Sequence, residues 1–245
     1  MAELVDALDS GSSGQLVRGS SSLLLGTILF YSRSMKIHLY QNDLPSDLEF
    51  LKATYSGEVA IDTEAMGLKA GRDRLCLVQI SLGDGVCHLV QMSPQKTYPA
   101  SAPNLKKLLE NKNVLKIFHF ARFDLGKLQE YLGCKVSSIF CTKVASKLTR
   151  TYTDRHSLKE LCREILKIDI LKEEGCSDWG QQKLSPAQLN YAAGDVLYLH
   201  ELKKHLLYLL KRENRYDMAQ ACFNFLPSLA EMDTHGFNGD EVIRY

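Results

Sequence analysis

The sequence lacks the cysteine pattern of a disulfide-bonded or zinc-binding protein. Its 245 residues include seven cysteines, an odd number, and no Cys-x-x-Cys pair. Several of them lie in apolar stretches, as buried free thiols usually do. Neither a disulfide framework nor a zinc site is therefore indicated. Reduced thiols are typical of the cytoplasm, and we expect a cytoplasmic protein.

The sequence also has no excess of charge of one sign and no long hydrophobic run. The formal net charge is +1, which says little about partners. The apolar stretch from Leu23 to Tyr31 is too short to cross a membrane as a helix. Glu3, Asp6 and Asp9 precede it, where a signal peptide would be basic. We therefore expect no membrane partner.

The first 34 residues differ from the rest of the chain because they are rich in Ser and Gly. We expect residues 1–34 to be a disordered or non-native extension, with Met35 as an alternative functional start. The chain is 45% hydrophobic, which can fill a sizeable core. One domain over residues 35–235 is the simplest organisation.

Apolar runs and turn signals after Met35 predict an α/β domain. Gly83-Asp84-Gly85 is typical of a hairpin, so part of the sheet should be antiparallel. The expected strands are 36–40, 58–64, 74–82, 86–91, 114–119 and 138–141. The expected helices are 44–54, 102–111 and 123–132, followed by a helical remainder.

Two acidic residues end one of the buried strands. Val59-Ala60-Ile61 leads into Asp62 and Glu64, and residues two apart on a strand point to the same face. Open α/β sheets bind ligands at the carboxyl ends of their strands, which favours a catalytic role. The alternative is that Asp-x-Glu is simply a solvated strand end.

Two more acidic residues and a tyrosine fall on expected helices. Asp124 lies in a first helical turn, where its charge also stabilises the helix by roughly 0.3 to 1 kcal/mol. Ser185 and Pro186 predict a helix start, which puts Tyr191 and Asp195 one turn apart on one face. An ordinary surface pair is the alternative for these two.

Together the four acids predict a divalent metal site. Carboxylates that converge in one pocket repel unless cations neutralise them, and two divalent ions match four carboxylates in charge. Mg²⁺ and Mn²⁺ take oxygen ligands, and a pair of such ions supports in-line displacement at phosphorus. We expect two of these cations as cofactors, held by Asp62, Glu64, Asp124 and Asp195.

The sequence from Met35 to Leu226 resembles the DEDD exonucleases, in the branch with a tyrosine in its third motif (DEDDy), and most closely ribonuclease D. The motifs match Asp62-Thr63-Glu64, His119 through Asp124, and Tyr191-x-x-x-Asp195. Similar flanking text lies at Leu75 to Ser81 and at Ser177-Asp178-Trp179. The resemblance implies an α/β ribonuclease H-like fold, a mixed sheet flanked by helices with a helical C-terminal part.

The resemblance further implies a 3′-5′ exoribonuclease that releases nucleoside 5′-monophosphates from single-stranded RNA 3′ ends, such as tRNA or small RNA precursors. Asp62, Glu64 and Asp195 would hold one metal, and Asp62 and Asp124 the second. Tyr191 would orient the attacking water, because a phenol with a usual pKa near 10 is mostly neutral.

Substrate-binding residues are also implied by the resemblance. Met66 and Leu68 match an apolar wedge against the terminal bases, and Phe123 is a candidate for base stacking. Stacking tolerates any base, which suits an enzyme that meets successive different nucleotides. Core packing is the alternative for all three. His119 is the remaining candidate, with a hydrogen-bonded core position as its alternative.

Two basic groups are candidates for contacts with a phosphate backbone. We favour the first group, which follows the second motif, over the second, for which solvated helix faces are an equally good explanation. The groups are Lys143, Lys147, Arg150, Arg155 and Lys159, and then Lys203, Lys204, Lys211, Arg212 and Arg215.

One departure from the family bears on substrate range. Longer ribonuclease D proteins carry helicase-and-ribonuclease-D C-terminal (HRDC) domains, and we expect none here. The protein is expected to be a monomer or a homodimer. The alternative functions are a 3′-5′ DNA exonuclease and an inactive nucleic-acid-binding scaffold. The presence of all five motif residues argues against the scaffold.

Overall fold

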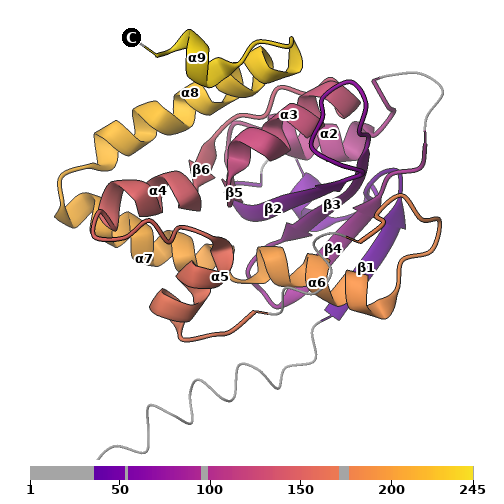
Figure 1. Ribbon diagram of the computed structural model, residues 1–245. Coiled ribbons are helices and arrows are strands. Elements are labelled where there is room, and N and C mark those ends of the chain that lie inside the picture. The colour runs from indigo at the N-terminus through magenta and orange to yellow at the C-terminus, as the bar shows by residue number, and fades with distance from the viewer. Residues whose placement is uncertain (1–35, 53–54, 95–98, 171–176, 245) are drawn as a thin grey trace, which may run out of the picture. The chain divides into compact units, whose positions relative to one another are not determined.

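A six-stranded mixed sheet forms the centre of the computed structural model, which describes residues 36–52, 55–94, 99–170 and 177–244 (Figure 1). The strand order is β1-β4-β3-β2-β5-β6. β2, β3 and β4 pair antiparallel, and β1, β5 and β6 pair in parallel with their neighbours. The bounds are β1 Lys36–Gln41, β2 Gly57–Ala65, β3 Leu75–Ser81, β4 Val86–Gln91, β5 Val114–Phe118 and β6 Ile139–Cys141. The six expected strands and the hairpin are confirmed, whereas the expectation for residues 1–34 lies outside the described ranges.

Helices cover both faces of the sheet (Figure 1). One face carries α2 Pro103–Glu110 and α3 Ala121–Leu132, and the other carries α6 Pro186–Leu197 and α7 Leu199–Arg212. The remaining helices are α4 Thr142–Thr149, α5 Leu158–Leu161 with the π-helical turn η2 Cys162–Leu166, α8 Tyr216–Thr234 and α9 Gly239–Val242. The α/β class and the helical C-terminal part are as expected.

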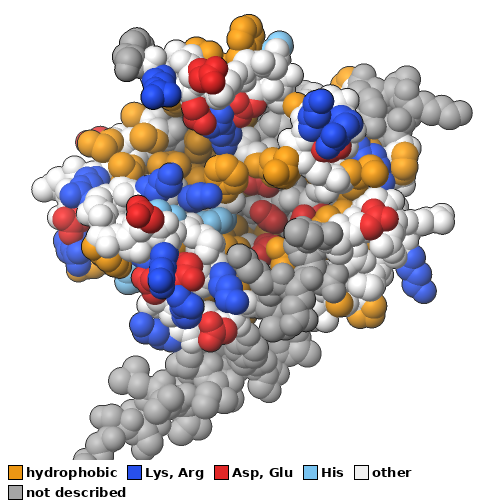
Figure 2. All heavy atoms as spheres, in the orientation of Figure 1, with side chains coloured by type: hydrophobic (Ala, Val, Ile, Leu, Met, Phe, Trp, Pro, Cys, Tyr) orange, Lys and Arg blue, Asp and Glu red, His pale blue; other side chains and the backbone are white. Residues whose placement is uncertain are grey.

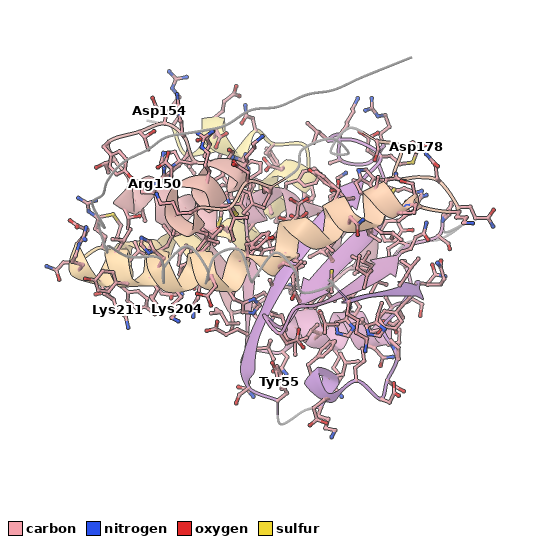
Figure 3. The ribbon with its side chains drawn as sticks, turned by 90° about the horizontal axis from the view of Figure 1, so that it is seen from below. Tyr55, Arg150, Asp154, Asp178, Lys204 and Lys211 are labelled. Carbon is pink, nitrogen blue, oxygen red and sulfur yellow. The ribbon has the colours of Figure 1, made fainter. Side chains whose placement is uncertain are left out.

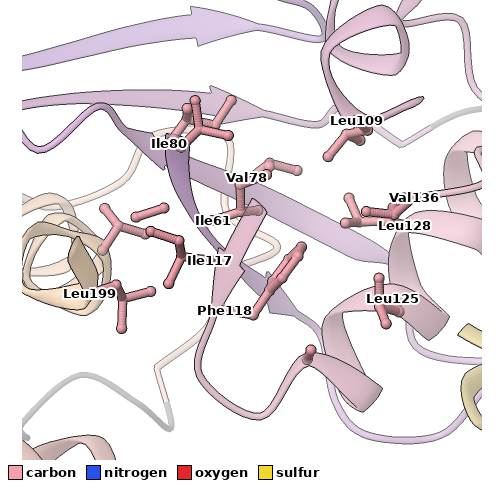
Figure 4. Close-up of a cluster of buried hydrophobic side chains, with 14 of the residues drawn as sticks. Ile61, Val78, Ile80, Leu109, Ile117, Phe118, Leu125, Leu128, Val136 and Leu199 are labelled. Atoms are coloured by element: carbon pink, nitrogen blue, oxygen red, sulfur yellow. The ribbon is translucent and has the colours of Figure 1, made fainter. Parts of the chain in front are cut away.

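Apolar side chains on the two faces of the sheet form the core (Figure 4). Phe118 of β5 faces Leu125 and Leu128 of α3, whereas its neighbour Ile117 faces Leu199 of α7. This split follows from strand geometry, in which successive side chains point to opposite faces. A central strand must therefore be apolar on both sides, which explains the continuous apolar runs.

The start of α6 is defined by hydrogen bonds that its sequence dictates. The Ser185 hydroxyl accepts from the backbone N–H of Gln188 (3.1 Å), and the Gln188 side chain accepts from the backbone N–H of Ser185 (2.9 Å). This reciprocal pair is a capping box, with Pro186 in the first turn. The predicted helix start is confirmed, and Gln188 adds a partner that the sequence analysis did not identify.

The C-terminal helices brace α3. Arg122 in the first turn of α3 donates to both carboxylate oxygens of Asp233 (2.5 and 2.7 Å) and to Asp240 (2.6 Å). Asp233 lies at the end of α8 and Asp240 in α9. The helix that carries Asp124, α3, is therefore held in place by residues of α8 and α9.

The helix expected over 44–54 is wrong within the described part of that range, which contains only the short 3₁₀ turn η1, Glu49–Leu51. The Asp43 carboxylate accepts backbone N–H groups at the start of α2, including that of Leu105 (2.8 Å), and holds this segment there. The apolar spacing instead reflects a loop with three buried side chains, Leu44, Phe50 and Leu51.

The structure also describes six of the seven cysteines and the length of each helix. Six cysteines of the described residues are free. Five of them are buried, namely Cys76, Cys87, Cys134, Cys141 and Cys162, and Cys222 is half-buried. Reduced thiols are thus confirmed for these six, whereas Cys176 lies outside the described ranges. Among the helices described, none has the length and apolar character that a membrane crossing requires.

The core packing predicts a clear difference between two leucines. Leu128 is fully buried in α3, so Leu128→Ala should lower the free energy of unfolding by about 2 to 5 kcal/mol. Leu68 is 84% exposed, and Leu68→Ala should change it by less than about 0.5 kcal/mol. Urea unfolding curves measure both, and equal losses would contradict this packing.

Candidate active site

Asp62 and Glu64 meet Asp195 at one face of the sheet. One carboxylate oxygen from each of the three residues lies within 4.8 Å of the other two. Asp62 and Glu64 lie on β2 and Asp195 on α6. Figure 2 shows acidic side chains gathered at the centre of this face of the molecule, beside a band of hydrophobic side chains. The structure therefore brings together two of the three sequence motifs in one half-buried cluster.

Asp124 approaches β2 from the other side. Thr63 lies between Asp62 and Glu64 and so points to the opposite face of the strand. Its hydroxyl donates to Asp124 at 2.6 Å, and Asp124 is only 2% exposed. The sequence analysis missed Thr63, because a threonine in a strand is normally a packing residue. One short stretch of β2 thus brings the acids of both helices together.

Tyr191 lies one turn before Asp195 and is hydrogen-bonded to its carboxylate. The Tyr191 ring centroid is 6.1 Å from that of Trp179, which is buried behind it, as expected for a packing residue. Burial, with the charges of Asp195, Glu64 and Asp62, raises the pKa of Tyr191. Its phenol therefore stays protonated and can donate.

The four carboxylates are costly to ionise together. Burial is the largest cause, and it raises the pKa of Glu64 to about 9, of Asp124 to about 8 and of Asp195 to about 7. Burial followed by the charges of the other three acids also raises the pKa of Asp62 well above its usual range. Oxygen donors that repel one another in this way fit divalent cations, which would restore the ionised forms.

The segment before α6 is tied to the sheet by two long side chains. The Arg74 guanidinium donates to the carbonyl of Met92 (2.7 Å) and to that of Gly180 (3.2 Å). The Gln91 amide donates to the carbonyl of Gln181 (2.9 Å). These contacts hold the segment that leads into α6, the helix that carries Tyr191 and Asp195. Sequence reasoning did not identify them.

The loop after β2 carries the predicted wedge residues. Met66 is 59% exposed and Leu68 is 84% exposed, so neither is a core residue. The loop is nevertheless rigidly held, because Lys127 of α3 donates to the Asp73 carbonyl at 2.6 Å. A Cβ at Gly67 would lie 2.4 Å from the Asp73 carboxylate, so a side chain there would displace that carboxylate. The core-packing alternative is excluded for Met66 and Leu68, and substrate binding stays a prediction.

Phe123 and His119 belong to the second motif, which also contains Asp124. Phe123 is half-buried, with the Lys127 ammonium 6.0 Å from its ring centroid. His119 contacts the Thr142 hydroxyl at 2.9 Å. Burial lowers the pKa of His119 to about 3, so the ring is neutral. This is the hydrogen-bonded environment considered as its alternative, and the substrate contacts of both residues stay predictions.

The favoured basic group contains one residue that cannot act as an exposed cation. Arg150 is 2% exposed, donates to the Ser146 hydroxyl (3.0 Å) and the Arg155 carbonyl (2.8 Å), and pairs with Glu164. Its expected role in following a phosphate backbone is therefore wrong, because the guanidinium is committed inside the fold. Its neighbour on α4, Lys147, is exposed.

The second basic group is partly neutralised. Lys203 pairs with Glu58, and Arg212 pairs with Glu213. Lys204 and Lys211 are exposed and project from α7 (Figure 3). The group therefore agrees better with a solvated helix face than with a continuous binding track.

The raised pKa values predict that the metal-free protein loses stability as pH rises. The acids are protonated in the folded state up to about pH 7 to 9 but lose their protons near pH 4 when unfolded. The contribution of these acids to the free energy of unfolding should therefore be fully present below pH 4 and be lost as the pH rises towards 9.

With a chelator present, the midpoint temperature of thermal unfolding should fall between pH 5 and pH 9, because these acids lose their protons in the folded state over that range. Mg²⁺ should reverse this fall. Asp195→Asn removes one of the charges, so it should raise the metal-free midpoint at pH 9 and reduce the gain from Mg²⁺. A midpoint independent of Mg²⁺ in the unchanged protein would contradict the metal site.

Comparison with known proteins gives one consistent result. A family model described as 3′-5′ exonuclease matches residues 39–211. Ribonuclease D from Jannaschia sp. is 34% identical over 158 residues, which are 64% of this chain and 40% of that protein. The chain therefore spans less than half the length of this relative.

Solved structures of Brucella melitensis NrnC are similar over most of the chain. One is 49% identical with a TM-score of 0.79, and covers 86% of this chain and 100% of that one. A form bound to pGG is 52% identical with a TM-score of 0.75, over 83% and 95% of the two chains. A form with bound Mg²⁺ is 50% identical with a TM-score of 0.74, over 82% and 95%.

Proposed function

Since the chain belongs to the DEDD ribonuclease D-like 3′-5′ exonuclease family, we propose that it removes nucleoside 5′-monophosphates from the 3′ end of single-stranded RNA. The observation that carries this proposal is the convergence of Asp62, Glu64 and Asp195 within 4.8 Å at the end of β2. The substrates we propose are tRNA or small RNA precursors and short RNAs, and the NrnC form bound to pGG supports the last of these.

We assign the site to the DEDDy type, with Asp62, Glu64, Asp124 and Asp195 as ligands for two divalent cations. The bound Mg²⁺ in the NrnC structure supports Mg²⁺, and Mn²⁺ has the same ligand preference. When bound, such a pair supplies charge stabilisation for the attacking and leaving oxygens of the phosphodiester. Thr63 would hold Asp124 in place for this task through its 2.6 Å hydrogen bond.

Tyr191 would position the attacking water. Its hydroxyl is oriented by Asp195, and its pKa is raised, so it acts as a neutral hydrogen-bond partner and not as a strong base. Glu64, which precedes the exposed Met66 loop, would contact the terminal 3′-hydroxyl. A contact of this kind would restrict cleavage to chain ends. Met66, Leu68, His119 and Phe123 are the proposed substrate-binding residues.

The test of this function compares RNA and DNA oligomers of one sequence, each labelled at the 5′ end, with Mg²⁺ or Mn²⁺. We expect stepwise shortening of the RNA from its 3′ end, and suppression of that shortening by a 3′-phosphate, because the Glu64 contact is lost. Faster digestion of DNA would favour the alternative DNA exonuclease. Rapid cutting of a circular RNA would refute exonuclease action.

Two substitutions in α6 separate positioning from metal binding. Tyr191→Phe removes only the hydroxyl that would position the water, so it should slow hydrolysis by about 10²-fold, as misplacement of a reacting group does, and keep metal affinity. Asp195→Ala removes a proposed metal ligand, so it should lose both hydrolysis and metal affinity. Titration calorimetry with Mn²⁺ measures the affinities, and equal affinities in the two variants would refute the assignment.

A further inference from the structure

We propose that Phe120 is a stacking platform for the nucleobase on the 5′ side of the phosphodiester that is cut, with Lys143 behind the ring and Lys147 beside it for the adjoining phosphate. The proposal rests on the proposed exonuclease function, because it places a second nucleotide relative to the same site. It adds one aromatic and two cationic residues to the substrate contacts.

Phe120 is an exposed aromatic residue next to the second-motif acid. The residue is 47% exposed, directly precedes α3 and lies four residues before Asp124. β2 and β5 run parallel with Ala60 opposite Ile117, so the residues after β5, including Phe120, follow that strand at the same end of the sheet as Asp62 and Glu64.

The backbone at Phe120 is held in a conformation that favours glycine. Its φ is 68° and its ψ is 45°, the left-handed region, which is rare for a bulky side chain. The flanking segments enforce it. The Thr142 hydroxyl donates to the Phe118 carbonyl at 3.0 Å, and the Phe123 N–H donates to the Phe120 carbonyl at 3.2 Å. A strained residue retained beside a reactive cluster is a reasonable sign of function.

Lys143 makes the platform one-sided. Its ammonium lies 3.9 Å from the Phe120 ring centroid, a cation–π contact that covers one side of the ring. Lys147 follows one turn later on α4. Neither lysine forms a salt bridge with a carboxylate of the described residues, unlike Arg122 of the same region. The pair is therefore available to a phosphate, while the uncovered part of the ring is available to a base.

The position of the ring selects the upstream nucleotide. Met66 and Leu68 follow β2 next to Glu64, and we assign them to the terminal base. Phe120 follows β5, the neighbouring strand, on the side of Asp124. The two apolar positions thus follow neighbouring parallel strands, of which β2 carries Asp62 and Glu64, so we assign the terminal base to the first position and the preceding base to Phe120.

The test is a thermodynamic cycle that combines substitution of Phe120 with removal of the second-last base of the RNA. Equilibrium binding is measured for each of the four combinations. Fluorescence anisotropy compares a short 5′-labelled RNA with the same RNA lacking the base of its second-last nucleotide, both with a non-cleavable last linkage and with Mg²⁺ present. Loss of the base should weaken binding to the unchanged protein about tenfold, the scale of one stacked base. With Phe120→Ala the same loss should be about twofold or less.

Conservative and matched variants make the result specific. Phe120→Trp keeps an aromatic surface and should restore the tenfold effect, whereas Phe120→Leu should behave like alanine. Phe237→Ala removes another exposed phenylalanine, 62% exposed and far along the chain, and should keep the full effect. If Phe120→Ala fails to fold, Phe120→Gly replaces it, because glycine accepts the left-handed backbone.

Additive losses from residue and base would overturn the platform, as would a full base effect in Phe120→Leu. Failure of the proposed function is read separately, on the cleavable form of the same RNA. If that RNA stays intact with Mg²⁺ and Mn²⁺ while the binding cycle shows coupling, the exonuclease proposal fails and the base site stands. If the RNA is trimmed and the losses are additive, only the platform fails.

Discussion

The repulsion between acidic groups held at the end of one strand governs the architecture of this protein. Asp62, Glu64, Asp124 and Asp195 would separate if their backbones were free, since each charge raises the energy of the others. Rigid elements prevent this. A central strand supplies two of the acids, and two helices packed on opposite faces of the sheet supply one each. Divalent cations would offset this repulsion. The fold holds the carboxylates that would bind them close together.

The contacts around the acids share one task, which is to keep the segments that carry them from moving apart. Thr63 joins β2 to α3, Lys127 joins α3 to the loop after β2, and Arg74 joins the sheet to the segment before α6. None of these side chains is an acid of the site. Each uses hydrogen bonds to restrict the motion of a segment that bears an acid or adjoins one, and so lowers the entropic cost of assembling the cluster.

Local periodicity explains what could be predicted from the sequence. Asp62 with Glu64 and Tyr191 with Asp195 follow strand and helix repeats, so neighbours in the chain reveal their common faces. Thr63, Lys127 and Arg74 have partners 61, 54 and 106 positions away, which no local pattern encodes. The error at Arg150 has the same origin, because a sequence does not distinguish a cation committed to its own fold from one offered to a ligand. The helix expected over 44–54 failed because apolar spacing alone does not separate a loop from a helix.

The Arg122 contacts with Asp233 and Asp240 tie the helix that carries Asp124 to residues outside the range that the family model matches. The family match ends at residue 211, yet the helix bearing Asp124 is fixed by residues from α8 and α9. A recombinant fragment trimmed to the matched region would keep all four acids of the cluster. It would lose the Arg122 contacts that hold the helix of the second motif. Boundaries drawn from the family model alone would thus separate Arg122 from its two carboxylate partners.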